Sequence, residues 1–260
     1  ITLQPDLDIA TVSICLENGA LFQWLDFHLK PNLHSGLQAD GKLRIDGDRA
    51  IWKPSKGRAV LSLKVKLTHR RQNGKYDARM TPDWAIFRGD DMIPPVKVLT
   101  VKDATLIAKL HFELPPGWTN VDTGWPREPD GSFTIDNPRR RFDRPVGWMI
   151  AGKVGTRREL IGATEICVGA PVGSIMRRMD ILTFINFNWR EVERAFEKKP
   201  SKLLVVGAGD PMWRGGLSSP NSFFLHADRP IVSENGTSAL LHELTHVITR
   251  IRGEMNDDWI

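Results

Sequence analysis

The sequence is poor in cysteine and holds no long apolar run. Only Cys15 and Cys167 occur among its 260 residues, which is too few for a disulfide framework or a cysteine zinc site. This pattern favours two buried free thiols and leaves a single bridge open. No segment approaches the roughly 20 consecutive apolar residues that a membrane helix needs. We therefore expect no membrane partner.

Positive charge is in modest excess, with a formal net charge of +5 and a pI near 9.3. Such a balance raises the hypothesis of nucleic-acid binding. The basic residues, however, form short clusters beside turn residues, at positions 69–71, 139–141 and 157–158. No nucleic-acid-binding motif accompanies them, so the sequence favours solvated loops and predicts no nucleic-acid partner.

Alternating apolar and polar residues dominate the first two-thirds of the chain. Residues 61–67 alternate in this way, which is the period of a strand with one solvated face. Residues 106–114 and 21–29 show the same alternation, and turn signals such as Asn73-Gly74 separate the runs. The pattern predicts an antiparallel β-rich N-terminal domain over residues 1–170, as a sandwich or a large open sheet.

The pattern changes to a mixture of helices and strands over residues 171–260, so the fold class expected for the whole chain is α+β. Residues 174–197 have a helical period, with room for a break at Asn186 and Asn188. Residues 203–206 and 222–225 are predicted to be short strands. A last helix is predicted from about residue 237 to 252, ended by Gly253. The apolar positions expected on the first helix are Ile175, Met179, Leu182, Ile185 and Val192.

The strongest chemical signal is His242-Glu243-Leu244-Thr245-His246 in the last helix. Histidines four residues apart project from one face of a helix and can bind one zinc ion through their ring nitrogens. Glu243 lies beside the first histidine, where its carboxylate can act as a general base on water. The sequence therefore predicts zinc as the cofactor, His242 and His246 as its ligands and Glu243 as the catalytic residue. The alternative is a buried helix with two hydrogen-bonded histidines and a solvated glutamate.

Residues 240–246, together with a second segment that opens at Asp257-Asp258-Trp259, resemble the gluzincin metallopeptidases. The closest resemblance is to the glycyl aminopeptidase family, and aminopeptidase N is more distant. It implies a β-rich N-terminal domain followed by the first part of a thermolysin-like catalytic domain, here residues 171–260. Gly215, Gly216 and Leu217 look like the family's substrate-lining edge strand, which can hold a peptide by backbone pairing. The alternative is an ordinary glycine turn before a strand.

The chain departs from that family in two places. Related enzymes commonly carry an amine-capturing glutamate in the edge-strand motif, where this chain has Ser218 and Ser219. The family's third zinc ligand is a glutamate shortly after a tryptophan like Trp259, and the sequence ends at Ile260 before it. The family's transition-state tyrosine also lies downstream. Tyr76, the only tyrosine here, is expected to be a strand or loop residue.

These observations lead to two principal hypotheses about function. The first is zinc-dependent, aminopeptidase-like hydrolysis of peptides by the parent protein, with this apparently truncated chain weak or inactive alone. The second is a noncatalytic binding protein on a truncated or degraded peptidase scaffold. Glu254, Asp257, Asp258 and His226 are outside candidates for a third ligand within the chain. The resemblance fits a periplasmic or secreted protein, and the compartment stays open.

Overall fold

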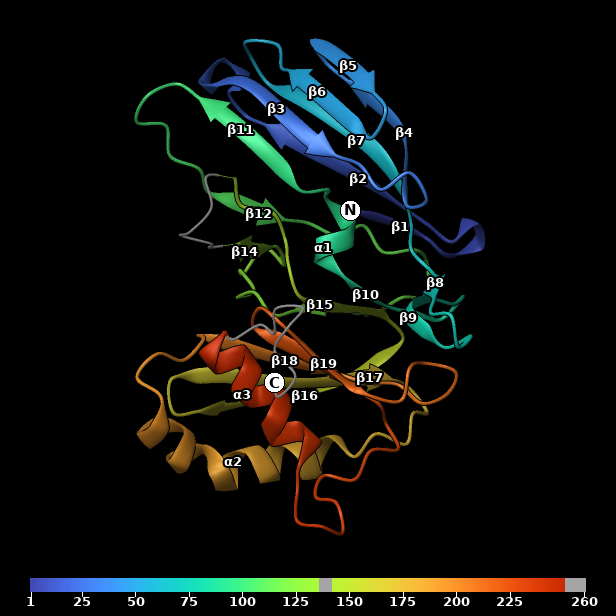
Figure 1. Cartoon of the computed structure of the whole chain (residues 1–260), viewed down its shortest axis with the longest axis vertical. Helices are drawn as coiled ribbons and strands as arrows, with labels where there is room; N and C mark the ends of the chain where they lie inside the picture. The colour runs from blue at the N-terminus through green and yellow to red at the C-terminus, as the bar shows by residue number, and fades with distance from the viewer. Residues whose placement is uncertain (136–141, 251–260) are drawn as a thin grey trace.

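The computed structural model describes residues 1–135 and 142–250. Its first part is built from two four-stranded antiparallel sheets that share one apolar core (Figure 1). The strands predicted at residues 61–67 and 21–29 are confirmed as β7 and β3. The first sheet is, in order, β1 (Thr2–Gln4), β2 (Ile9–Leu16), β7 (Ala59–Lys66) and β4 (His34–Ala39). The second is β11 (Val96–Thr100), β3 (Phe22–His28), β6 (Arg49–Lys53) and β5 (Lys42–Asp46).

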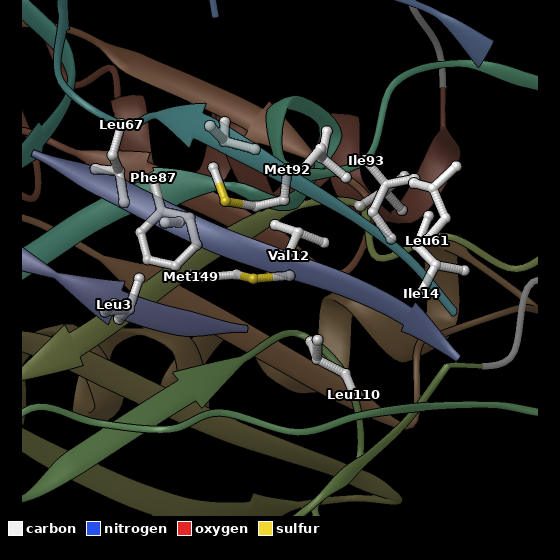
Figure 2. Close-up of a cluster of buried hydrophobic side chains, with 14 of the residues drawn as sticks. Leu3, Val12, Ile14, Leu61, Leu67, Phe87, Met92, Ile93, Leu110 and Met149 are labelled. Carbon is white, nitrogen blue, oxygen red and sulfur yellow. The ribbon is translucent and has the colours of Figure 1, made fainter. Parts of the chain in front are cut away.

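A third, five-stranded antiparallel sheet links this region to the C-terminal part. In order it contains β13 (Asn120–Thr123), β15 (Trp148–Gly152), β10 (Trp84–Arg88), β9 (Tyr76–Met80) and β8 (His69–Arg70). The short helix α1 (Gly89–Met92) follows β10. Figure 2 shows Phe87 and Met149 of this sheet near Val12 of the first sheet. The third sheet and the sandwich therefore share one core.

One predicted strand is much shorter than expected. Within residues 106–114 only β12 (Ala108–Leu110) forms, because only these residues pair with β14 (Phe133–Ile135). Leu106, Phe112 and Leu114 pack partly buried against the core without strand pairing. The apolar–polar alternation correctly indicated that one side of this segment is buried. The segment buries that side with an irregular backbone and not as a long strand.

The last sheet carries the C-terminal part. Its order is β16 (Val154–Ile161), β17 (Thr164–Pro171), β18 (Lys202–Val206), β20 (Ser222–Leu225) and β19 (Gly216–Ser219). Strands β17, β18 and β20 are parallel, while β16 and β19 run antiparallel at the two edges. Helices α2 (Arg178–Ala195) and α3 (Ala239–Thr249) cover one face. The third sheet covers the other face, and Figure 1 shows α2 below this sheet and β15 above it.

The structure confirms the α+β class with its β-rich N-terminal part, and it corrects two expectations for helix α2. The β16–β17 hairpin pairs with β18, so in strand pairing the C-terminal sheet begins before residue 170. The domain limits at 170 and 171 stay a prediction. Helix α2 runs unbroken through Asn186 and Asn188, and it buries Ile181, Leu182, Ile185 and Trp189. Ile175 and Met179 are exposed instead.

Two smaller expectations also have outcomes. Cys15 and Cys167 are both free, as predicted, but Cys15 is exposed because it lies on the outer face of β2. Helix α3 ends at Thr249, three residues earlier than expected. Arg250 follows it in the left-handed conformation that a glycine such as Gly253 commonly adopts after a helix. Gly253 itself lies outside the described residues. No helix within the described ranges has both the length and the apolar character needed to cross a membrane.

Candidate active site

Helix α3 presents the His-Glu-x-x-His sequence on a well-anchored scaffold. The side chain of Ser238 caps its N-terminus by accepting a hydrogen bond from the Leu241 N–H at 3.3 Å, which satisfies one of the free donors of the first turn. Leu240, Leu244 and Val247 are buried against the last sheet. The apolar positions thus fix the helix, and they leave the histidine face turned away from the core.

The two histidines of the motif point at one another. Their Nε2 atoms are 3.1 Å apart, with ring centroids 4.6 Å apart. Two nitrogen ligands at about 2.0–2.1 Å from a tetrahedral zinc ion lie roughly 3.3 Å apart. His242 is exposed and His246 is half-buried, so the pair is open on one side. The arrangement fits two ligands of one zinc ion.

The described residues supply no third ligand, since no group of three or more metal-binding side chains occurs among them. Glu254, Asp257 and Asp258 lie outside the described ranges. His226, the other outside candidate, is buried after β20, and its Nδ1 accepts a hydrogen bond from the Asp228 N–H. Its ring lies between Asp210 and Asp228. His226 thus belongs to a separate cluster.

Glu243 is buried, with 8% of its surface exposed. Burial raises the pKa of its carboxyl, while His242, His246 and hydrogen bonds from Ser218 act in the opposite direction without reversing the shift. A Cβ atom built on Gly216 would lie 2.6 Å from Glu243 Oε1. The carboxylate is therefore held directly against the backbone of the edge strand.

Gly215, Gly216 and Leu217 lie at the edge strand β19, and α3 contacts this strand. Gly216 pairs with Leu225 and Leu217 pairs with Phe224, so one side of β19 is used by β20. Because β19 is the last strand of the sheet, its other side is an edge to which an extended chain could be added. The structure thus brings the predicted edge strand and the predicted catalytic helix together.

Two tryptophans at this site were not singled out from the sequence, and Ser218 was noted only as a departure from the family's motif. The Trp148 indole N–H donates to the Leu217 carbonyl at 2.8 Å, which ties the third sheet to the edge strand. The Trp213 ring occupies the space that a side chain at position 215 would need. Ser218 hydrogen-bonds to Glu243. The adjacent glycines were the one available signal, since paired glycines indicate close approach of other groups to the backbone.

The basic clusters differ from the expected solvated loops. Arg158 pairs with Asp122, a carboxylate with no exposed surface, and Lys202 donates to the same side chain at 2.7 Å. Residues 69–71 lie on and after strand β8, where Arg71 stacks on Trp213. The cluster at 139–141 lies outside the described residues. Two of the three clusters are thus used in contacts between the N-terminal and C-terminal parts.

Comparison with known proteins gives similarity in structure only. No protein-family model matches the sequence, and no curated protein matches it. Among solved structures, an aminopeptidase N family protein from Idiomarina loihiensis has a TM-score of 0.63 at 17% identity, over 88% of this chain and 43% of that one. Leukotriene A4 hydrolase from Saccharomyces cerevisiae has a TM-score of 0.56 at 12% identity, over 95% and 42%.

An M1 zinc metallopeptidase mutant from Deinococcus radiodurans has a TM-score of 0.54 at 13% identity, over 92% of this chain and 59% of that one. The chain thus spans between about two-fifths and three-fifths of the length of these three proteins. At these identities the likeness shows the fold alone. The chain shares its fold with part of proteins described as aminopeptidase N family members and M1 zinc metallopeptidases.

Proposed function

We propose that the protein to which this chain belongs is a zinc-dependent, aminopeptidase-like peptidase. His242 and His246 hold the zinc, and Glu243 is the general base. The observation that carries the proposal is the convergence of the two Nε2 atoms at 3.1 Å, one helical turn apart and beside a buried glutamate. The similar folds of zinc metallopeptidases support it.

The substrate peptide lies along β19 in this proposal. Its backbone pairs with the open side of the strand, which places a carbonyl near Glu243 because Gly216 brings the strand against that carboxylate. The Leu217 carbonyl also accepts a hydrogen bond from the Trp148 indole at 2.8 Å, which helps to fix the strand. A fixed edge strand orients the peptide before the reaction and so lowers its entropic cost.

Glu243 then serves in two proton transfers. It accepts a proton from the attacking water as the new C–O bond forms, and it passes the proton to the leaving nitrogen as the C–N bond breaks. A carboxyl whose pKa is raised by burial suits this role near neutral pH. Zinc, when bound, supplies Lewis-acid polarisation of the carbonyl and a more acidic water.

Metal content tests the proposal directly. Zinc is measured by mass spectrometry after dialysis of the 260-residue chain and of His246→Ala, with His111→Ala as a control because His111 is exposed and outside the site. We expect zinc to be lost with His246→Ala and retained with His111→Ala. Zinc retained by His246→Ala at the level of the unchanged chain would contradict the assignment and favour the noncatalytic hypothesis.

Peptide hydrolysis by this chain alone is expected to be weak. Two histidines hold zinc poorly compared with the three protein ligands of ordinary catalytic sites. The measurement is hydrolysis of a fluorogenic aminoacyl substrate with added zinc, compared between the chain and Glu243→Gln. Turnover that is fast in the chain and unchanged in Glu243→Gln would show that Glu243 is not the base.

A further inference from the structure

We propose that Arg70, Arg71 and Arg79 form an anion subsite at the Trp213 end of the substrate strand, which binds a carboxylate of the peptide. This inference rests on the proposed function, because it assigns a class of substrate to the same edge strand. The three arginines come from the β8–β9 region of the N-terminal part. They meet the C-terminal part where the chain approaches β19.

Backbone hydrogen bonds join the two regions. The Tyr76 N–H donates to the Pro211 carbonyl at 3.1 Å, and the Trp213 N–H donates to the Tyr76 carbonyl at 3.0 Å. Tyr76 and Met212 thereby form an isolated parallel bridge. Strand β9 is thus fixed to the segment that leads into β19. The arginines of the β8–β9 region therefore have a defined position relative to β19.

Aromatic rings hold the guanidinium groups in place. Arg70 lies 4.6 Å from the centroid of the Tyr76 ring and donates a hydrogen bond to the Tyr76 hydroxyl. Arg79 lies 5.1 Å from the same ring and 5.6 Å from the Trp84 ring. Arg71 lies over Trp213 at 3.8 Å. A guanidinium stacked on a ring keeps its N–H edge available for a carboxylate.

The charges around the subsite are incompletely neutralised. Within the described part of the chain, neither Arg70 nor Arg79 pairs with a carboxylate, and Arg71 pairs through Nε with Asp77. The neighbouring cations Lys75 and Arg214 are already paired with Asp210. Arg70 and Arg79 are thus available to an added anion, and arginine suits carboxylate recognition.

The subsite lies on the path of an extended peptide. The Trp213 ring packs over Gly215, and Gly216 lies against Glu243. Trp213 precedes Gly216 by three residues, and the chain bends at Arg214 and Gly215, so that the Trp213 ring lies close to the start of β19. A peptide paired with β19 that continues past the Gly216 end of the strand would therefore run toward Trp213 and the Arg71 guanidinium stacked on it. The carboxylate comes from an acidic side chain or from the peptide's C-terminus.

Peptide binding to the metal-free 260-residue chain, measured by calorimetry in EDTA, tests the subsite. The probes are a five-residue alanine peptide ending in glutamate with a free C-terminus, its amide, the corresponding glutamine peptide and the glutamine amide. We expect the glutamine amide to bind about ten-fold more weakly than the peptide with both carboxylates. Affinity that follows the free C-terminus identifies that carboxylate, and affinity that follows glutamate identifies the side chain.

Variants separate the subsite from general effects. Arg79→Gln is expected to lose about ten-fold in affinity for the anionic peptide and nothing for the glutamine amide, while Arg79→Lys retains part of the preference. Arg157→Gln is the control, because Arg157 is an exposed arginine at the opposite edge of the last sheet. Equal binding of charged and neutral peptides would overturn the subsite and leave the zinc assignment intact. Absence of binding by every peptide would overturn the subsite and the edge-strand role together.

Discussion

Glu243 and Gly216 are in direct contact, so that the carboxylate fills the space that any side chain at position 216 would need. A Cβ atom there would lie 2.6 Å from Oε1 and 2.7 Å from Cγ of the glutamate. Because Cβ atoms do not approach other heavy atoms so closely, either the glutamate or the strand has to move. The position of the general base therefore depends on the absence of a side chain across from it.

Gly216→Ala tests this dependence. We expect peptidase activity of the zinc-loaded protein to fall at least ten-fold, because displacement of a catalytic group by about 1 Å costs on the order of a hundred-fold in rate. Zinc content should stay unchanged, since the histidines are not displaced. The matched control is Gly209→Ala, where an added Cβ meets no atom within 4 Å. Full activity in Gly216→Ala would show that Glu243 is not held by the strand.

A buried ion-pair network joins the third sheet to the last one. Asp122 on β13 has no exposed surface, and it accepts hydrogen bonds from Lys202 at 2.7 Å and from Arg158 Nε at 3.2 Å. Asp122→Asn would leave the buried, charged Lys202 with only the partly exposed carboxylate of Glu165, 3.6 Å away, in place of its close buried partner. We expect this to lower the free energy of unfolding by about 3–5 kcal/mol at pH 7, as measured by urea denaturation.

The control for that change is Asp83→Asn. Asp83 pairs with Lys153 at a similar distance of 2.7 Å, but more than half of each side chain is exposed. Exposed pairs contribute about 1 kcal/mol or less, so we expect a small loss. Equal losses in both variants would contradict the idea that burial makes the Asp122 network costly to break.

The same network predicts a dependence on pH. Burial alone raises the pKa of Asp122, but the charges of Lys202 and Arg158 outweigh burial and set the pKa below its ordinary value. A carboxyl with a lowered pKa in the folded state stabilises the fold above its unfolded pKa of about 3.9. That stabilisation is lost as the pH falls through the folded pKa. The stability difference between wild type and Asp122→Asn should therefore be constant from pH 7 to 5 and shrink below about pH 4. If the stability difference between the two proteins grew on acidification, the pKa of Asp122 would be raised in the folded state and not lowered.

The sequence predicted elements whose signal is local. Strand β7 alternates because one of its faces is buried, and α3 shows its histidines and apolar residues on separate faces because the period is 3.6 residues. The edge strand was expected from the resemblance of Gly215, Gly216 and Leu217 to a short family motif. Each of these signals lies within about ten residues, so no knowledge of partners was needed.

Features that depend on distant partners were not predicted. Asp122 lies 36 residues from Arg158 and 80 from Lys202, and nothing in any of the three segments indicates the others. The β16–β17 hairpin shows no apolar–polar alternation, and only its pairing with β18 assigns it to the last sheet. Helix α2 was predicted with part of its apolar face in the wrong orientation, because Ile175 precedes the helix and Met179 lies on its outer side.

Trp148 links the N-terminal part to the substrate strand through one hydrogen bond, and Trp148→Phe removes it. The ring packing on Phe224, with centroids 5.3 Å apart, should be largely retained, while the Leu217 carbonyl loses the hydrogen bond from the indole. We expect a loss of about 0.5–1.5 kcal/mol in the free energy of unfolding. We also expect weaker binding of the neutral alanine-glutamine amide peptide, because the edge strand is less firmly held.

Trp118→Phe provides the comparison that separates these two effects. The Trp118 indole N–H also donates to a backbone carbonyl at 2.8 Å, that of Pro82, and Trp118 is also buried, but it lies in the N-terminal core. The two variants should therefore lose similar stability, since each removes one indole hydrogen bond to a backbone carbonyl. Only Trp148→Phe should weaken peptide binding in calorimetry. If Trp118→Phe weakened peptide binding equally, the loss of binding would follow from the loss of global stability. The hydrogen bond from Trp148 to Leu217 would then have no specific role in peptide binding.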